Sequence, residues 1–302
     1  MIQETKKTEK DVLVLDAGNL LFFKNVEPSF PSAQKKEALL SAQLMVQAFN
    51  LMGCDAAGIG ADDLRLGTID FAAVNKMAQF PFISANVVSK DGHKVSVSSV
   101  VKNAGGLRWG IFSLMSATPS PASRSQRWKV LDPVTTGNQA VKELQAQADI
   151  IILLAAMPVE ELRALLTQLP GVTIAVAGGA PGGLIRPLQV GRTIVVCSPG
   201  FGKYLGMLRL SLKDPKAPFV DEARITELGR ALAVAEKRIR EGASGSFEEK
   251  KKMEAELQEL KEGNIYHNEL IALSSNVQEE RGMKRFIEDF RSKKGELGKG
   301  CK

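Results

Sequence analysis

From Asp11 to about Lys213, short β-branched or apolar runs alternate with segments of helical periodicity, and this alternation constrains the fold more than any other feature of the sequence. A chain of this kind folds into layers in which helices cover sheets. The sequence therefore predicts an α/β, or layered α+β, domain. The runs that predict strands are residues 12–15, 56–59, 82–86, 94–103, 107–114, 150–154, 173–177, 193–197 and 206–212.

Helices are predicted between these strands. The clearest runs from Ala38 to Met52, where apolar residues recur every three or four positions and form one face. Gly53 follows it directly, and glycine is the residue that most often ends a helix. Two shorter helices are predicted at 137–148 and 159–168, and each is followed by a predicted strand.

After about Pro215 the sequence becomes highly charged and helical. Residues 225–239 carry an apolar side chain every three or four positions. Residues 242–247 predict a turn, with Ser246 as the N-cap of a second helix. Together these segments predict a helical hairpin that resembles a coiled coil.

This change in character predicts two domains, 1–214 and 215–302. Acidic and basic residues are equally numerous in residues 221–302, which indicates solvated helix faces with i,i+4 pairs rather than a binding patch. Beyond the hairpin, a strand is predicted within 265–277 and a last helix at 279–294.

The composition excludes several classes of function. The net charge is +6, but basic residues are scattered among acidic ones and aromatic residues are only 6%, which does not favour nucleic-acid binding. The apolar runs are well short of the roughly 20 residues that a membrane span requires. Residues 1–10 contain no apolar core, so no signal peptide is expected within them. Cys54, Cys197 and Cys301 form no paired motif, so neither a zinc cluster nor a disulfide framework is predicted.

A series of segments carries a more specific signal. The strand at 12–15 leads to Gly18-Asn19, and the helix that ends before Gly53 leads to Gly60-Ala61-Asp62-Asp63. In content and order these segments resemble the 5'-nucleotidase branch of the calcineurin-like metallophosphoesterases, over about residues 11–212. The resemblance implies a two-sheet β-sandwich flanked by helices. The other matching segments are Phe80–Val87, which is the most specific, Ala148–Ala156, Val172–Gly182 and Val195–Leu210, which resembles a closing β-hairpin.

The same resemblance implies that the family's metal ligands are replaced here. The aspartate that bridges two metal ions in the family corresponds to Asn19, close to Asp16. The family's Gly-Asn-His-Glu motif corresponds to Gly60-Ala61-Asp62-Asp63. Its later metal-binding histidines correspond to three further positions, Ala156, Ala180 and Gly182.

The supply of histidine leads to the same prediction without the family. A dinuclear hydrolytic centre needs several imidazoles and carboxylates around two cations. The chain has 2 histidines, His93 and His267. His93 is predicted in a hairpin turn and His267 ahead of a C-terminal strand, and neither lies in a motif that the resemblance assigns to metal. We therefore predict a non-catalytic module for binding or assembly, without a cofactor.

An alternative stays open. Asp16, Asn19, Asp62 and Asp63 are all predicted near strand ends, and hard cations such as Mg²⁺ or Ca²⁺ accept shells made of oxygen alone. A weakly bound divalent metal would then support a phosphoesterase of the nucleotidase class. Asp62 and Asp63 are equally explained as acidic residues at a helix N-terminus, where the helix dipole stabilises them.

The resemblance also implies a cellular setting. The family's first metal motif, Asp-x-His, lies on a strand ahead of the one at 12–15, and residues 1–11 do not contain it. Cys301-Lys302 would open a Cys-x-x-Cys-His haem-attachment motif if the chain continued, and some exported 5'-nucleotidase-like domains resemble such a layout. We therefore expect a periplasmic or extracytoplasmic protein with an attached cytochrome region, whose helical extension binds a protein partner.

Overall fold

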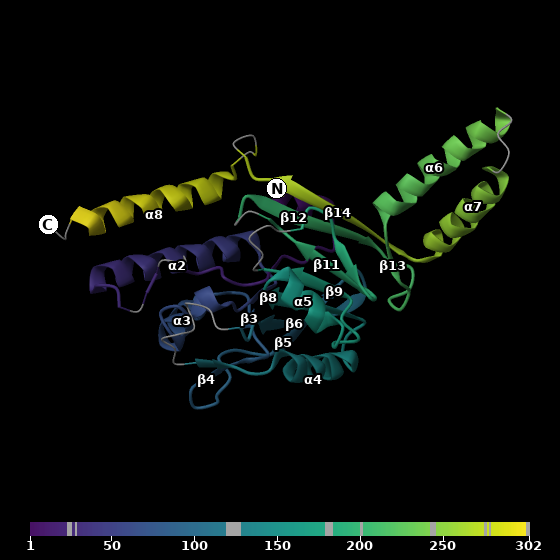
Figure 1. Ribbon diagram of the computed structural model, residues 1–302. Coiled ribbons are helices and arrows are strands. Elements are labelled where there is room, and N and C mark those ends of the chain that lie inside the picture. The colour runs from purple at the N-terminus through teal and green to yellow at the C-terminus, as the bar shows by residue number, and fades with distance from the viewer. Residues whose placement is uncertain are drawn as a thin grey trace. The chain divides into compact units, whose positions relative to one another are not determined.

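The computed structural model describes residues 1–22, 26–27, 29–118, 128–178, 184–199, 202–241, 246–274, 277 and 279–299 (Figure 1). The chain divides into two compact units, a larger unit of Met1–Lys203 with Leu273–Lys302 and a smaller unit of Tyr204–Ala272. This division differs from the expected domains 1–214 and 215–302. The reason is that β12 (Tyr204–Ser211) pairs with β14 (Asn264–Ala272).

The larger unit is built on a six-stranded mixed sheet of order β10-β11-β9-β8-β6-β5. Its inner strands are parallel to one another, and both edge strands run antiparallel to their neighbours. β8 is buried along its whole length. Its sequence is a continuous apolar run, as expected for a strand that is covered on both faces. The strands are β5 (Ser99–Ala104), β6 (Leu107–Met115), β8 (Ile150–Ala156), β9 (Ile174–Ala177), β10 (Leu188–Val190) and β11 (Thr193–Cys197).

A second sheet in this unit has three parallel strands in the order β1-β2-β3. These are β1 (Leu15–Asp16), β2 (Ala56–Gly58) and β3 (Phe82–Ile83). Because parallel strands end at the same edge of a sheet, the loops that follow β1 and β2 are neighbours. A short antiparallel ribbon pairs β4 (Val87–Ser89) with β7 (Trp128–Val130).

Helices accompany both sheets, which confirms the predicted layered α/β class. α2 (Ser32–Met52) contains the clearest predicted helix and ends at Gly53, whose φ of 69° is left-handed. α4 (Pro133–Gln145) follows Asp132, which caps it by accepting the N–H of Thr135. The remaining helices of the unit are α1 (Ile2–Thr8), the 3₁₀ helix η1 (Ala61–Leu64), α3 (Thr68–Asn75), α5 (Val159–Leu166) and α8 (Arg281–Lys299).

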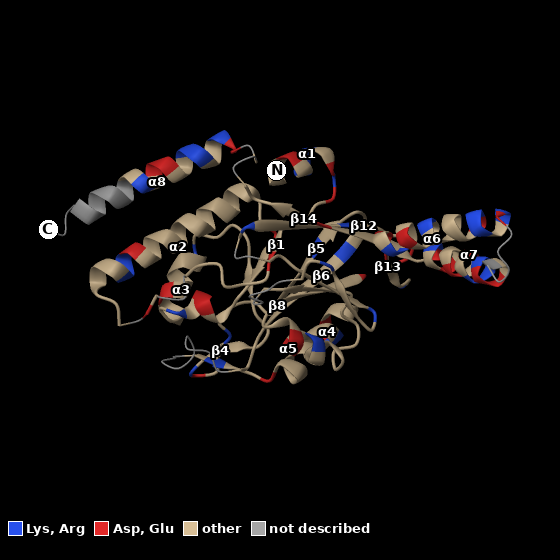
Figure 2. Cartoon of the chain, turned by 45° about the horizontal axis from the view of Figure 1, so that its top comes forward, with Lys and Arg blue, Asp and Glu red and all other residues tan. Residues whose placement is uncertain are grey.

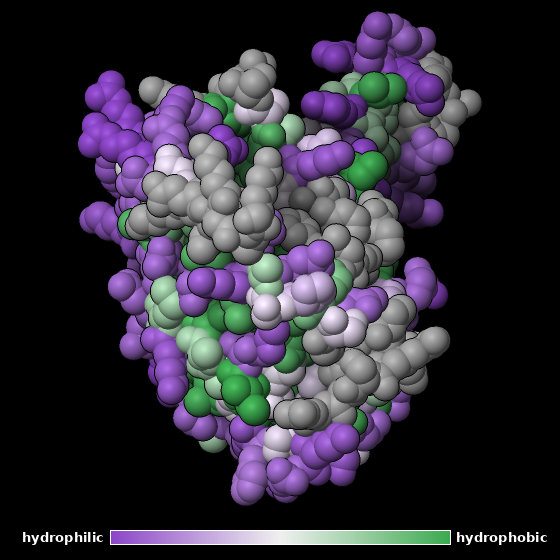
Figure 3. Space-filling view, turned by 90° about the vertical axis from the view of Figure 1, so that its left-hand side faces the viewer, coloured by the Kyte–Doolittle hydropathy of each residue, from purple (hydrophilic) through white to green (hydrophobic). Residues whose placement is uncertain are grey.

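Two clusters of buried side chains hold these layers together. One joins the six-stranded sheet to α4 and α5 and includes Phe112 and Leu153. The other joins the three-stranded sheet to α2 and α3 and includes Val46, Phe71 and Phe82. On the face shown in Figure 3, hydrophilic side chains surround smaller hydrophobic areas, as expected when most large apolar side chains are interior.

The smaller unit confirms the predicted helical hairpin. α6 (Glu222–Arg240) follows β13 (Phe219–Asp221), and Asp221 caps the helix by accepting the N–H of Ala223. α7 (Ser246–Glu262) returns beside α6, and ion pairs join the two helices at Arg224–Glu256 and Glu236–Lys250. The hairpin leads into a three-stranded sheet of order β12-β14-β13.

Two expectations about this region are wrong. Residues 195–210 do not form a closing hairpin, because β11 pairs with β9 and β10 whereas β12 pairs with β14. His267 lies within β14, not ahead of it, and its ring contacts Glu222 at 2.8 Å. In addition, β5 begins at Ser99 instead of residue 94. No helix among the described residues is long and apolar enough to cross a membrane.

Candidate functional site

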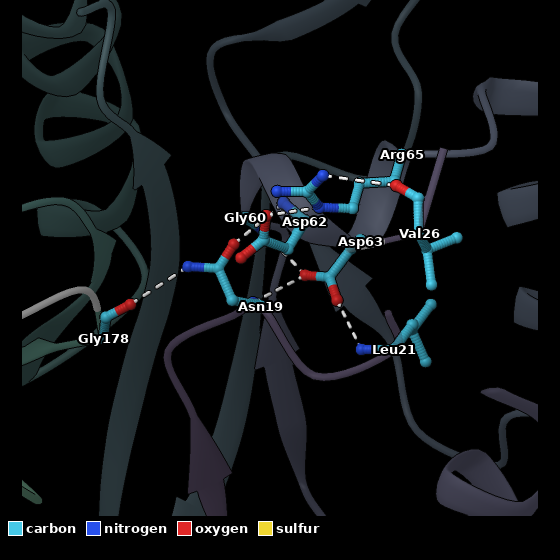
Figure 4. Close-up of polar contacts among 8 residues, drawn as sticks. All are labelled: Asn19, Leu21, Val26, Gly60, Asp62, Asp63, Arg65 and Gly178. Atoms are coloured by element: carbon cyan, nitrogen blue, oxygen red, sulfur yellow. Dashed lines mark hydrogen bonds and ion pairs between the residues drawn. The ribbon is translucent and has the colours of Figure 1, made fainter. Parts of the chain in front are cut away.

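The candidate site lies where the loops after β1, β2 and β9 meet (Figure 4). Asn19 comes from the loop after β1, and Asp62 and Asp63 come from η1, which follows β2. Gly178 comes directly after β9 of the six-stranded sheet. The structure thus brings together residues from three loops and from both sheets of the larger unit.

Asp63 is at the centre of this arrangement and is fully buried. Its Oδ2 accepts the backbone N–H groups of Asn19 and Gly60, each at 2.8 Å, and its Oδ1 accepts that of Leu21 at 2.8 Å. Burial raises the pKa of Asp63 to about 7, while these hydrogen bonds lower it and the charge of Asp16 raises it. Backbone N–H groups therefore compensate this buried carboxylate.

Asn19 connects the two sheets. Its Nδ2 donates to the carbonyl of Gly178 at 3.2 Å, and its Oδ1 accepts the N–H of Asp62 at 2.9 Å. Its backbone φ of 65° is the one left-handed value at a non-glycine residue in the part of the chain that the structure describes. Asparagine tolerates this conformation better than most residues do.

Gly60 is in direct contact with Asn19. A Cβ atom on Gly60 would lie 2.2 Å from Oδ1 of Asn19 and 2.7 Å from its backbone N. Both are far below van der Waals contact, so only glycine fits beside the Asn19 side chain as it stands.

A Gly60→Ala variant should therefore unfold more easily. We expect a loss of about 2 to 3 kcal/mol in the free energy of unfolding, because Asn19 must move and give up its hydrogen bonds. Thermal unfolding followed by circular dichroism measures it. Gly229→Ala is the control, since Gly229 lies in α6 with open space around its Cα. That control should keep or raise the melting temperature, and an equal drop in both variants would contradict the steric explanation.

The neighbouring acidic residues are also engaged. Asp62 forms an ion pair with Nε of Arg65 at 2.7 Å, and both side chains are largely buried. Nη1 of Arg65 donates to the carbonyl of Val26 at 3.2 Å. Asp16 accepts the N–H of Gly18 at 2.8 Å, and burial raises its pKa to about 6, partly offset by that hydrogen bond.

The other positions that the sequence singled out lie in different surroundings. Ala61 begins η1 and packs against the core. Ala156 is the last residue of β8, and its methyl side chain is buried. Its backbone carbonyl accepts the N–H of Ser116. His93 is exposed in the turn after β4, as predicted. Ala180, Gly182 and Cys301 lie outside the described residues.

Sequence reasoning missed two partners in the site. Arg65 was not singled out, although its i,i+3 spacing from Asp62 was a signal for a helical ion pair. The carbonyl of Gly178 was also missed, because a backbone acceptor leaves no mark on the sequence. Of the positions that the sequence presented as vacated ligand positions, Asn19, Asp62 and Asp63 belong to a connected set of hydrogen bonds and ion pairs.

The related family implies a metal centre, and the described residues do not fit one. The oxygens of Asp63 and Asn19 face backbone N–H donors, and Asp62 faces a guanidinium. Among the described residues, no group of three or more His, Cys, Asp or Glu side chains is arranged to hold a metal ion. A cation at this point would have to displace hydrogen bonds that the backbone needs.

Known proteins that are similar to this chain in sequence or in structure include metallophosphoesterases and 5'-nucleotidases. No family model matches the chain. The chain is 23% identical over 171 residues to the uncharacterized metallophosphoesterase YunD of Bacillus subtilis, covering 55% of this chain and 37% of YunD. It is also similar in structure to the 5'-nucleotidase precursor of Thermus thermophilus, with a TM-score of 0.66, 18% identity and coverage of 96% of this chain and 51% of that one.

A third similar protein is the calcineurin-like phosphoesterase YfkN of Bacillus subtilis, with a TM-score of 0.65, 18% identity and coverage of 97% of this chain and 87% of that one. The chain thus spans well under two thirds of the length of YunD and of the 5'-nucleotidase precursor. The chain thus has the fold of calcineurin-like phosphoesterases and 5'-nucleotidases, and part of it is similar in sequence to an uncharacterized metallophosphoesterase.

Proposed function

We propose that the chain is a non-catalytic binding or assembly module built on a metallophosphoesterase fold. The observation that carries this proposal is the engagement of Asp63 and Asn19. Their side-chain oxygens accept backbone N–H groups at 2.8 to 2.9 Å, where a metal-dependent enzyme needs oxygens directed at cations. Oxygens engaged in this way are not directed at a cation that would activate a water molecule at neutral pH.

The charges around the site support the same proposal. Asp16, Asp62 and Asp63 bring three carboxyl groups to one edge of a sheet, and Arg65 is already paired with Asp62. A phosphate ester is itself an anion, so it would meet acidic side chains without a metal ion to offset them. The site therefore disfavours a phosphate group.

The helical hairpin is the element that we propose for a protein partner. Figure 2 marks acidic and basic positions along both α6 and α7. Exposed apolar side chains also occur here, with Val234 in α6 and Phe247 in α7 exposed by 53% and 67%. A periplasmic or extracytoplasmic location, an attached cytochrome region and haem attachment at Cys301 are further proposals.

An activity assay tests the proposal. In millimolar Mn²⁺, Mg²⁺ or Ca²⁺ we expect no hydrolysis of nucleoside monophosphates above the blank. We also expect no rise in melting temperature with these ions, since an ion that bound only the folded state would raise it. An active 5'-nucleotidase assayed in parallel is the positive control.

The alternative is a metal-dependent phosphoesterase that uses Asp16, Asn19, Asp62 and Asp63. The observation in its favour is that loops after parallel strands bring these residues to one sheet edge. Metal-dependent hydrolysis that disappears in Asp16→Asn but persists in Asp91→Asn, an exposed turn position, would establish this alternative and reject the non-catalytic module.

A further inference from the structure

We propose that the hydrogen bonds of Asp63 and Asn19 have taken over the structural role of the metal ions, so that the chain's own backbone fastens the loops after β1, β2 and β9. These hydrogen bonds would hold this edge of the fold together whether or not the chain hydrolyses phosphate esters.

The geometry of Asp63 suits this role. A metal ion links loops by gathering oxygens from several of them around one centre. Here the polarity is reversed, because one carboxylate gathers N–H donors from the loop after β1, at Asn19 and Leu21, and from the loop after β2, at Gly60. All three donor–acceptor distances are 2.8 Å, which is the short range of hydrogen bonds to a charged acceptor.

Asn19 extends the link to the six-stranded sheet. Its amide donates to Gly178 and accepts from Asp62, so one side chain connects the loops after β9 and β2. An aspartate at this position could accept from Asp62 but could not donate to the carbonyl of Gly178. The asparagine at this position, where the resemblance implies an aspartate in the family, thus supplies the donor that this contact requires.

The backbone around these side chains is packed closely. A Cβ atom on Gly178 would lie 2.6 Å from Cβ of Ala17 and 3.0 Å from the carbonyl carbon and oxygen of Ala17. The segment after β1 therefore touches the end of β9 directly. The contact between Gly178 and Ala17 and the hydrogen bonds of Asn19 together fix the distance between the loops after β1 and β9 without a metal ion.

Amide hydrogen exchange measured by NMR tests the inference. In Asp63→Asn, the side chain presents an NH₂ group to N–H donors, and we expect the amides of Asn19, Leu21 and Gly60 to exchange at least about tenfold faster than in the unchanged chain. Asp62→Asn is the matched control, because it leaves the three bonds to Asp63 in place. In that control the same amides should keep their protection.

A second measurement needs no variant and therefore no assumption that Asp63→Asn folds. In the unchanged chain, protection of the three amides should agree within about twofold between EDTA and millimolar Mg²⁺, which is diamagnetic. Protection that falls about tenfold in EDTA, or that survives in Asp63→Asn, would overturn the inference. Metal-dependent hydrolysis with unchanged protection would reject the proposed function alone, so the two failures are distinguishable.

Discussion

Asp63→Ala is expected to lower the free energy of unfolding of the larger unit by about 3 to 5 kcal/mol, because it removes the acceptor of three backbone N–H groups in a buried site. An unsatisfied buried donor costs about 1 to 3 kcal/mol, and water entering the vacated space would recover part of the total. Removing a buried carboxyl group recovers a further part. The loss should nevertheless exceed that of an ordinary surface substitution severalfold.

Urea unfolding followed by tryptophan fluorescence measures this effect. Trp109 and Trp128 both lie in the larger unit, so the signal reports on the unit that contains Asp63. The control is Asp91→Ala, the same chemical change in an exposed turn, which should stay within about 0.5 kcal/mol. A loss below about 1 kcal/mol at Asp63 would show that its hydrogen bonds contribute little to stability.

Leu153→Ala should cost about 3 to 5 kcal/mol in the same assay. Leu153 is fully buried in β8, between β6 and β9, and belongs to the cluster that joins the six-stranded sheet to α4 and α5. The substitution removes apolar contacts and leaves a cavity that the surrounding strands, held by ladders on both sides, cannot close.

Leu51→Ala makes the matched comparison. Leu51 lies in α2 of the same unit with 51% of its surface exposed, so the same change should cost under about 1 kcal/mol. Equal losses at the two positions would contradict the assignment of the core to the six-stranded sheet.

Much of the fold was predictable because it depends on short-range patterns. The apolar run at 150–154 appears as β8, and the helix that ends before Gly53 appears as α2, since periodicity and helix-ending chemistry are local properties. The helical hairpin at α6 and α7 was predictable for the same reason. Strand boundaries were less predictable, since β5 begins at Ser99 and not at residue 94.

Strand pairing was the part that local patterns could not predict. The sequence near Val195–Leu210 suggested one hairpin, yet β11 and β12 pair in different sheets. β12 is paired with β14, which lies more than fifty residues further along the chain. Pairing of this kind depends on which distant segment covers an edge, and residue periodicity contains no record of it.

In the candidate site, too, some features follow from the sequence and others only from the tertiary structure. The sequence by itself determined the order of the segments, the small number of histidines and the presence of asparagine at position 19. Only the tertiary structure decided what the remaining side chains do, because their partners are backbone groups such as the N–H of Leu21 and the carbonyl of Gly178. Every residue type except proline carries such groups, so their identity as partners arises from folding alone.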